Sequence, residues 1–129
     1  MNDYVKHKYD GKYILPTTVY LSTLWIIRDY YRLKEMVDNT ILQSQSHDDM
    51  PKGTDTTDPT ARKASKISSY MYRIRSLDKS IEMVPEEYRK GVWDNVMHRT
   101  RFPQDAARET YSRYKSMFVC EVAHRLDIS

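Results

Sequence analysis

Residues 58–84 read DPTARKASKISSYMYRIRSLDKSIEMV, and this stretch decides the fold. Asp58 followed by Pro59 is typical of a helix start, because aspartate caps a helix and proline is favoured at its first position. The apolar residues that follow are three and four positions apart, which is a heptad seam. They are Ile67, Tyr70, Ile74, Leu77, Ile81 and Val84. The stretch therefore predicts a long helix with a packed face.

A second helical pattern precedes this stretch and begins after Pro16. Its apolar residues recur at spacings of four, three and four, so they share one helical face. They are Tyr20, Leu24, Ile27 and Tyr31. The pattern holds to about Val37 and is compatible with a continuation through Ile41-Leu42. Residues 16–84 therefore predict a helical hairpin, although pairing of the helix 60–84 with a second subunit is an open alternative.

Two polar segments flank the first helix. Residues 1–15 form a tyrosine-rich polar arm. Residues 43–57 contain Pro51 and Gly53 and have no apolar periodicity, which predicts a long flexible loop. Loops of this length inside compact domains are uncommon and are usually functional or disordered.

Two more helices are predicted in residues 85–129. Pro85-Glu86-Glu87 reads as a first turn, where the helix dipole favours acidic residues. The apolar face of this helix consists of Tyr88, Val92, Trp93 and Val96. Pro103 then interrupts the helical pattern, and a last helix is expected from near Thr110 to Leu126. The predicted class is all-α, with arm, hairpin and C-terminal region forming one compact unit.

Composition supports one all-helical domain. The chain has 129 residues, with three glycines and five prolines, too few turn-formers for a many-stranded sandwich or barrel. Charge is uneven, because residues 1–59 sum to −2 and residues 60–129 to +5. Concentrated positive charge is expected of a surface that binds phosphate, although a solvated helix surface explains it equally well.

Several function classes lack sequence support. The single cysteine, Cys120, favours a reducing compartment and excludes a zinc site built from several cysteines. No apolar run is long enough to span a membrane, and Met1-Asn2-Asp3-Tyr4 does not resemble a signal peptide, so we expect a cytoplasmic protein. No phosphate loop, nucleophile elbow or zinc-peptidase motif indicates an enzyme. No cofactor or metal site is predicted.

The segment from Pro85 to Leu126 has the order of a helix-turn-helix, complete or degenerate: a packed helix, a polar connection and a longer basic helix. The N-terminal residues of a recognition helix reach base edges, so Arg113 is predicted to contact a guanine, with Ser112 and Ser116 bonding to bases or phosphates. Contacts to the phosphate backbone of double-stranded DNA are expected from Arg99, Arg101, Arg108 and Lys115.

The chain also resembles the RinA-like and ArpU-like regulators of phage late transcription, whose C-terminal part is similar to the helix-turn-helix of sigma-factor region four. The resembling residues, within about 28–127, are Tyr30 to Lys34, Gly53 to Ala61, Val84 to Arg89, Ala107 to Lys115, Phe118 and Val122 to Leu126. The resemblance implies sequence-specific promoter binding together with RNA polymerase. The DNA-reading positions it implies are Arg108, Glu109, Thr110, Ser112, Arg113 and Ser116.

One departure from that family lies in residues 101–107. The family has a full supporting helix before its recognition helix, and these residues leave room for only one or two turns. A different class of function also remains open. The heptad seam and the eleven tyrosines favour a helical structural or adaptor protein of phage assembly or DNA packaging, which would act through helix pairing.

Overall fold

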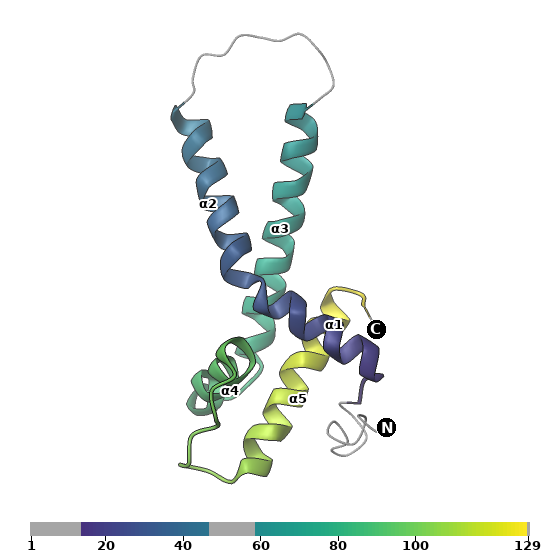
Figure 1. Ribbon diagram of the computed structural model, residues 1–129, viewed down its shortest axis with the longest axis vertical. Helices are drawn as coiled ribbons and strands as arrows, with labels where there is room; N and C mark the ends of the chain where they lie inside the picture. The colour runs from purple at the N-terminus through teal and green to yellow at the C-terminus, as the bar shows by residue number, and fades with distance from the viewer. Residues whose placement is uncertain (1–13, 47–58, 129) are drawn as a thin grey trace. The chain divides into compact units, whose positions relative to one another are not determined.

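The computed structural model describes residues 14–46 and 59–128, and helices are the only regular secondary structure in these ranges (Figure 1). They are α1 (Thr17–Arg28), α2 (Tyr30–Ser46), α3 (Pro59–Glu82), α4 (Glu86–His98) and α5 (Arg108–Arg125). The predicted all-α class is confirmed.

The first predicted helix is divided at Asp29. α1 ends at Arg28 and α2 begins at Tyr30. The backbone N–H of Asp29 donates to the carbonyl of Ile26, three residues earlier, over 3.1 Å. Such a bond tightens the last turn of a helix. The apolar spacing runs unchanged through this turn, which is why the sequence pattern predicts a single helix.

α2 extends into the predicted loop. Residues 43–46 belong to the helix, which ends at Ser46, so the prediction of a loop over 43–57 is wrong for these four positions. They are glutamine and serine, and glutamine is a good helix former, so a lack of apolar periodicity does not exclude a helix here. The remainder of the predicted loop and residues 1–13 of the predicted arm lie outside the described residues.

The prolines in the sequence correctly predict where the next two helices begin. α3 begins at Pro59, as the Asp58-Pro59 pair predicts, and ends shortly before Pro85. Pro85 is the residue that precedes α4, with φ −55° and ψ 142°. Glu86 and Glu87 occupy the first turn of α4, where their charge opposes the positive end of the helix dipole.

The described residues divide into two compact units, so the prediction of one unit is wrong. The first unit combines residues 14–29 with 76–128, and the second holds residues 30–75. The division inside α3 has a physical reason. Leu77, Ser80 and Val84 are almost fully buried and belong to the core of the first unit.

In the first unit, α1, α4 and α5 pack against one another (Figure 1). Its completely buried apolar side chains include Ile27, Val84, Val92, Val96, Phe118, Val119 and Val122. α5 is covered by both of the other helices, so its buried surface is wider than a single stripe. Ser116 and Ala123 are buried there in addition to Tyr111 and Phe118.

The second unit contains α2 and the first part of α3. Leu33 and Val37 are buried, whereas the seam residues Ile67, Tyr70 and Ile74 are only half-buried. A groove of about 160 Å³ runs between the two helices. It is lined by Lys34, Val37, Asp38, Met71, Ile74 and Arg75. Within this unit the predicted seam is therefore incompletely covered.

Candidate functional site

Residues 99–107 connect α4 to α5, and hydrogen bonds hold their first turn. Arg99 adopts the left-handed conformation with φ 58° and ψ 31°, and its N–H donates to the Asn95 carbonyl over 3.0 Å. The side-chain amide of Asn95 donates in turn to the Thr100 carbonyl over 2.8 Å. A non-glycine residue in this conformation costs on the order of 1 kcal/mol and often marks a functional site.

Tyr111 anchors the rest of the connection from the first turn of α5. Its ring stacks on Phe102 with centroids 5.3 Å apart and meets Tyr88 of α4 edge to face, also at 5.3 Å. Its hydroxyl donates to Asp105 Oδ1 over 2.7 Å. Burial and this hydrogen bond to a carboxylate raise the pKa of Tyr111 to about 12. Tyr111 therefore ties together α4, α5 and the connection.

Gly91 allows this close approach. A Cβ at this position of α4 would lie 2.6 Å from Tyr111 Cε1 and 2.8 Å from Pro103 Cδ.

Gly91→Ala is expected to destabilise the protein by about 1–2 kcal/mol, because overpacking outweighs the gain in helix propensity. Urea unfolding measures the change. Lys90→Ala, at the exposed neighbouring position, is the control, and a Gly91→Ala variant more stable than wild type would contradict the packing argument.

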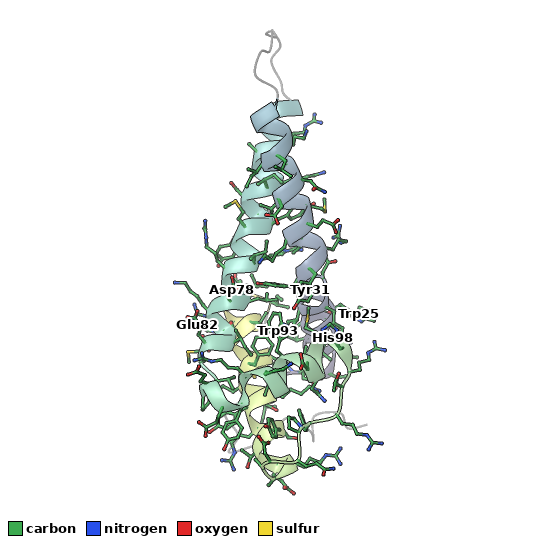
Figure 2. The ribbon with its side chains drawn as sticks, turned by 90° about the vertical axis from the view of Figure 1, so that its left-hand side faces the viewer. Trp25, Tyr31, Asp78, Glu82, Trp93 and His98 are labelled. Atoms are coloured by element: carbon green, nitrogen blue, oxygen red, sulfur yellow. The ribbon has the colours of Figure 1, made fainter. Side chains whose placement is uncertain are left out.

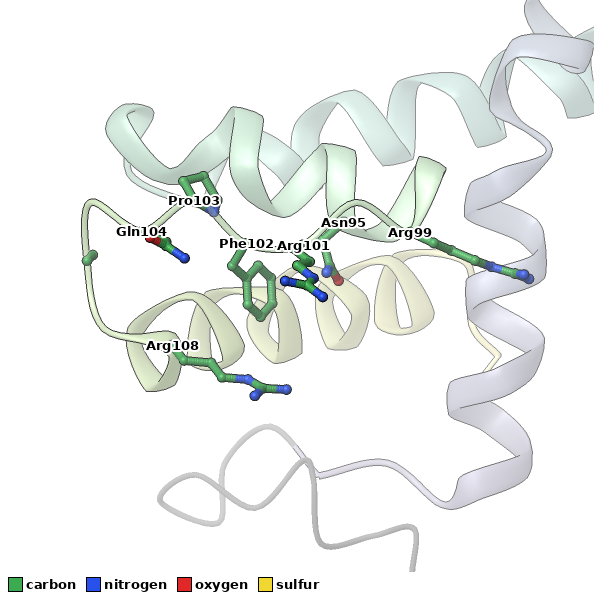
Figure 3. A pocket seen from close by; sticks show the side chains of 8 residues that line it. Asn95, Arg99, Arg101, Phe102, Pro103, Gln104 and Arg108 are labelled. Atoms are coloured by element: carbon green, nitrogen blue, oxygen red, sulfur yellow. The ribbon is translucent and has the colours of Figure 1, made fainter.

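Three arginines line a pocket of about 630 Å³ formed by this connection, and Figure 3 shows Arg99 extending away from Arg101 and Arg108. The lining residues are Asn95, Arg99, Arg101, Phe102, Pro103, Gln104, Ala106 and Arg108. None of them is acidic, and the nearby carboxylate of Asp105 is engaged by Tyr111. Guanidinium groups donate several hydrogen bonds in a planar array that matches phosphate oxygens. The pocket is therefore chemically suited to an anionic ligand that carries phosphate.

A fourth arginine extends the positive region from the pocket to α1. Arg28 Nε donates to the Val96 carbonyl of α4 over 2.8 Å, and the Arg28 guanidinium lies 5.8 Å from the ring centroid of Trp25. Burial and, next, repulsion from Arg99 lower the pKa of Arg28. An anion bound near these two arginines would reduce their mutual repulsion.

The predicted phosphate-contacting residues fall into two groups. Arg99, Arg101 and Arg108 all line the pocket, so the structure brings these three together. Lys115 is half-buried on α5 and does not line the pocket.

The predicted base-reading residues on α5 differ in exposure. Glu109 and Arg113 are exposed, and Thr110 and Ser112 are half-buried. Ser116 is only 4% exposed, and its prediction as a DNA contact is wrong for this structure. Ser116 belongs to the buried surface of α5, which packs against both α1 and α4.

The helix-turn-helix arrangement itself stays a prediction. α4 and α5 do pack against each other. The connection of residues 99–107, however, contains no helix and is longer than the turn of about 3–4 residues that is typical of the motif.

Sequence reasoning missed several residues at this site, namely Trp25, Arg28, Asn95, Phe102 and Gln104. A signal for Trp25 was present. The predicted apolar face of its helix contains Leu24 and Ile27, and Trp25 lies off that face. Trp25 does not occupy a core position, since its side chain is 64% exposed. No local pattern brings Arg28 to α4, because the contact joins residues far apart in the chain.

Other kinds of site find no support in the part of the chain that the structure describes. No group of three or more histidine, cysteine or acidic side chains there is arranged to hold a metal ion. The helices of residues 14–46 and 59–128 include none whose length and apolar character would let it cross a bilayer. Burial raises the pKa of the Cys120 thiol to about 11, which disfavours the reactive thiolate.

Comparisons with known proteins yield no match: no family model, no curated protein and no solved structure is similar to this chain. The resemblance to the RinA-like and ArpU-like regulators therefore stays a hypothesis based on the quoted residues.

Proposed function

We propose that the arginine pocket of this protein binds the sugar-phosphate backbone of DNA, and that the protein regulates transcription. The observation that carries the proposal is that Arg99, Arg101 and Arg108 all line one pocket, which has no acidic lining residue. Most protein–DNA hydrogen bonds go to phosphate and sugar, and these contacts supply much of the affinity. Tyr111 packs on the connection and bonds to it, so the backbone that carries Arg101 is anchored before DNA binds.

Sequence reading, in this proposal, comes from the exposed residues of α5 beside the pocket. Arg108 lines the pocket at the first position of α5, and Arg113 is exposed about one turn further along the helix. A phosphate held at Arg108 positions the backbone, and Arg113 then contacts a base edge.

The biological role follows from the sequence resemblance rather than from the pocket. As a regulator of the RinA-like type, the protein would be phage- or prophage-encoded and would act in the cytoplasm at a promoter together with RNA polymerase. Footprinting of the purified protein on its own late promoter region, with and without the polymerase, tests this part separately.

The first test is the salt dependence of binding to duplex DNA. Each phosphate contact contributes about 0.9 to the slope of log K against log salt concentration, so three arginine contacts predict a slope of about −3 or steeper. Fluorescence anisotropy with a labelled duplex, measured from low to physiological salt, gives this slope. Lys90→Ala is the control, because Lys90 already pairs with Asp94 on α4 and does not line the pocket. Absent or salt-insensitive binding would reject the proposal.

A second candidate function is a helical adaptor that acts through the second unit. The observation that favours it is the exposure of large apolar side chains on α2 and α3, among them Ile41, Leu42 and Tyr72. Exposed apolar residues of this kind often mark a surface that binds another protein. Multi-angle light scattering separates the two candidates. A stable oligomer that forms without DNA favours the adaptor, whereas a monomer at high concentration argues against it.

A further inference from the structure

Trp25 is the most exposed of the large apolar side chains in the first unit, and duplex backbone binding gives it no role. It is 64% exposed on α1 (Figure 2), and Leu21, one turn earlier on the same helix, is 49% exposed. Tryptophan has the largest ring of any side chain, and leaving most of it exposed to water forgoes the favourable burial of that apolar surface. Such an exposed aromatic ring indicates a contact surface.

The position of this ring is held by Arg28. The guanidinium group of Arg28 lies 5.8 Å from the Trp25 centroid, within the range of a cation–π interaction. Arg28 is itself fixed by its hydrogen bond to the Val96 carbonyl. Because Trp25 remains largely exposed beside this arginine, ring surface is available for stacking.

Trp25 is also connected to the arginine pocket. Arg28 donates to the carbonyl of Val96, and Asn95 and Arg99 at the same end of α4 line the pocket. An aromatic ring next to a row of arginines is the combination that binds single-stranded nucleic acid, in which the cations hold phosphates and the ring stacks a base. In an intact duplex the base faces are stacked on one another and are not available to a side chain.

We propose that Trp25 stacks on an unpaired base of a DNA strand whose phosphates occupy the arginine pocket. The site then prefers DNA with a single-stranded segment over an uninterrupted duplex. This inference rests on the proposed function and specifies the form of DNA that the site takes. A protein partner on the Trp25 surface is the alternative, and the experiment below distinguishes it.

The experiment compares three DNA probes by intrinsic tryptophan fluorescence and by anisotropy. The probes are an oligothymidylate of about 12 nucleotides, a blunt duplex of the same length, and that duplex with a single-stranded overhang. Wild-type protein is expected to show quenching with the oligothymidylate and the overhang, and tighter binding to the overhang probe than to the blunt duplex.

The decisive variant is Trp25→Ala, which alters an exposed position and leaves the core intact. Loss of one stacked base lowers the affinity for the oligothymidylate and the overhang roughly 5- to 100-fold. The affinity for the blunt duplex stays within about twofold of wild type, because no base stacks on Trp25 there. Trp25→Phe retains part of the lost affinity, since it keeps a smaller ring. Leu21→Ala, an exposed apolar change on the same helix, is the matched control and leaves all three affinities unchanged.

The possible failures differ in what they reject. If wild type and Trp25→Ala bind all three probes equally and no quenching occurs, the stacking role is overturned, a protein partner is favoured for Trp25, and duplex binding at the pocket stands. If neither protein binds any probe, the proposed DNA-binding function fails, and this inference fails with it.

Discussion

Removing the three pocket arginines together is expected to weaken DNA binding about 100-fold at roughly 0.15 M salt. The variant carries Arg99→Gly, Arg101→Ala and Arg108→Ala. Glycine is chosen at position 99 because it adopts the left-handed conformation without strain. Each lost phosphate contact is worth about 1 kcal/mol at this salt concentration, and 1.4 kcal/mol corresponds to tenfold in affinity. The salt slope should become less steep by about 3.

The control for this variant is a second triple change of equal charge. Lys79→Ala, Lys90→Ala and Arg125→Ala also remove three positive charges, which brings the formal net charge from +3 to 0 in both proteins. None of these three residues lines the pocket. Net charge alone predicts equal losses of affinity, whereas a pocket that holds phosphates predicts a small loss in the control. Equal losses in the two variants would contradict the assignment of the pocket.

The second large effect is expected at Tyr111. Tyr111→Ala should lower the free energy of unfolding by about 3–5 kcal/mol, the range for loss of a large buried aromatic ring. Because Phe102 and Asp105 lose their anchor, the variant should also bind DNA weakly under conditions where it is still folded. Tyr111→Phe keeps the ring and loses only the hydrogen bond to Asp105, so it should cost about 1 kcal/mol. Urea unfolding and anisotropy measure both quantities.

Alkaline pH provides a second comparison of Tyr111→Phe with wild type. The pKa of Tyr111 is raised to about 12 in the folded protein from an ordinary value of 10. The unfolded chain therefore loses its phenolic proton first, and the stability that this group contributes below pH 10 declines as the pH rises toward 12. Tyr20 and Cys120 contribute in the same direction in both proteins. The fall in stability above pH 10 should thus be shallower in Tyr111→Phe, and identical slopes would contradict the role of its hydroxyl.

Local signals in the chain predict much of the helix order. Asp58-Pro59 and Pro85-Glu86 mark two helix starts correctly, because capping and proline preferences depend only on neighbouring residues. The break at Asp29 escapes prediction, since one tightened turn leaves the spacing of the apolar side chains unchanged. The helical end of α2 escapes it as well, because glutamine and serine tolerate both helix and loop.

The candidate site is predicted only in part. Arg99, Arg101 and Arg108 are predicted from the sequence to contact phosphates, and in the structure all three line one pocket. Arg99 in the left-handed conformation and Gly91 in contact range of Pro103 shape that pocket, and neither feature leaves a sequence pattern.

The sequence by itself determined the all-α class, the starts of α3 and α4 and the accumulation of positive charge after residue 60. These properties arise from interactions within about one helical turn, so a local pattern contains them. Only the tertiary structure decided which residues along these helices are exposed. α1 packs against α5, whose Ser116 is buried, and the packing of α1 on α4 brings Arg28 to the Val96 carbonyl near the end of α4. That packing joins segments distant in the chain, and its energy depends on the fit of whole surfaces rather than on spacing within one helix.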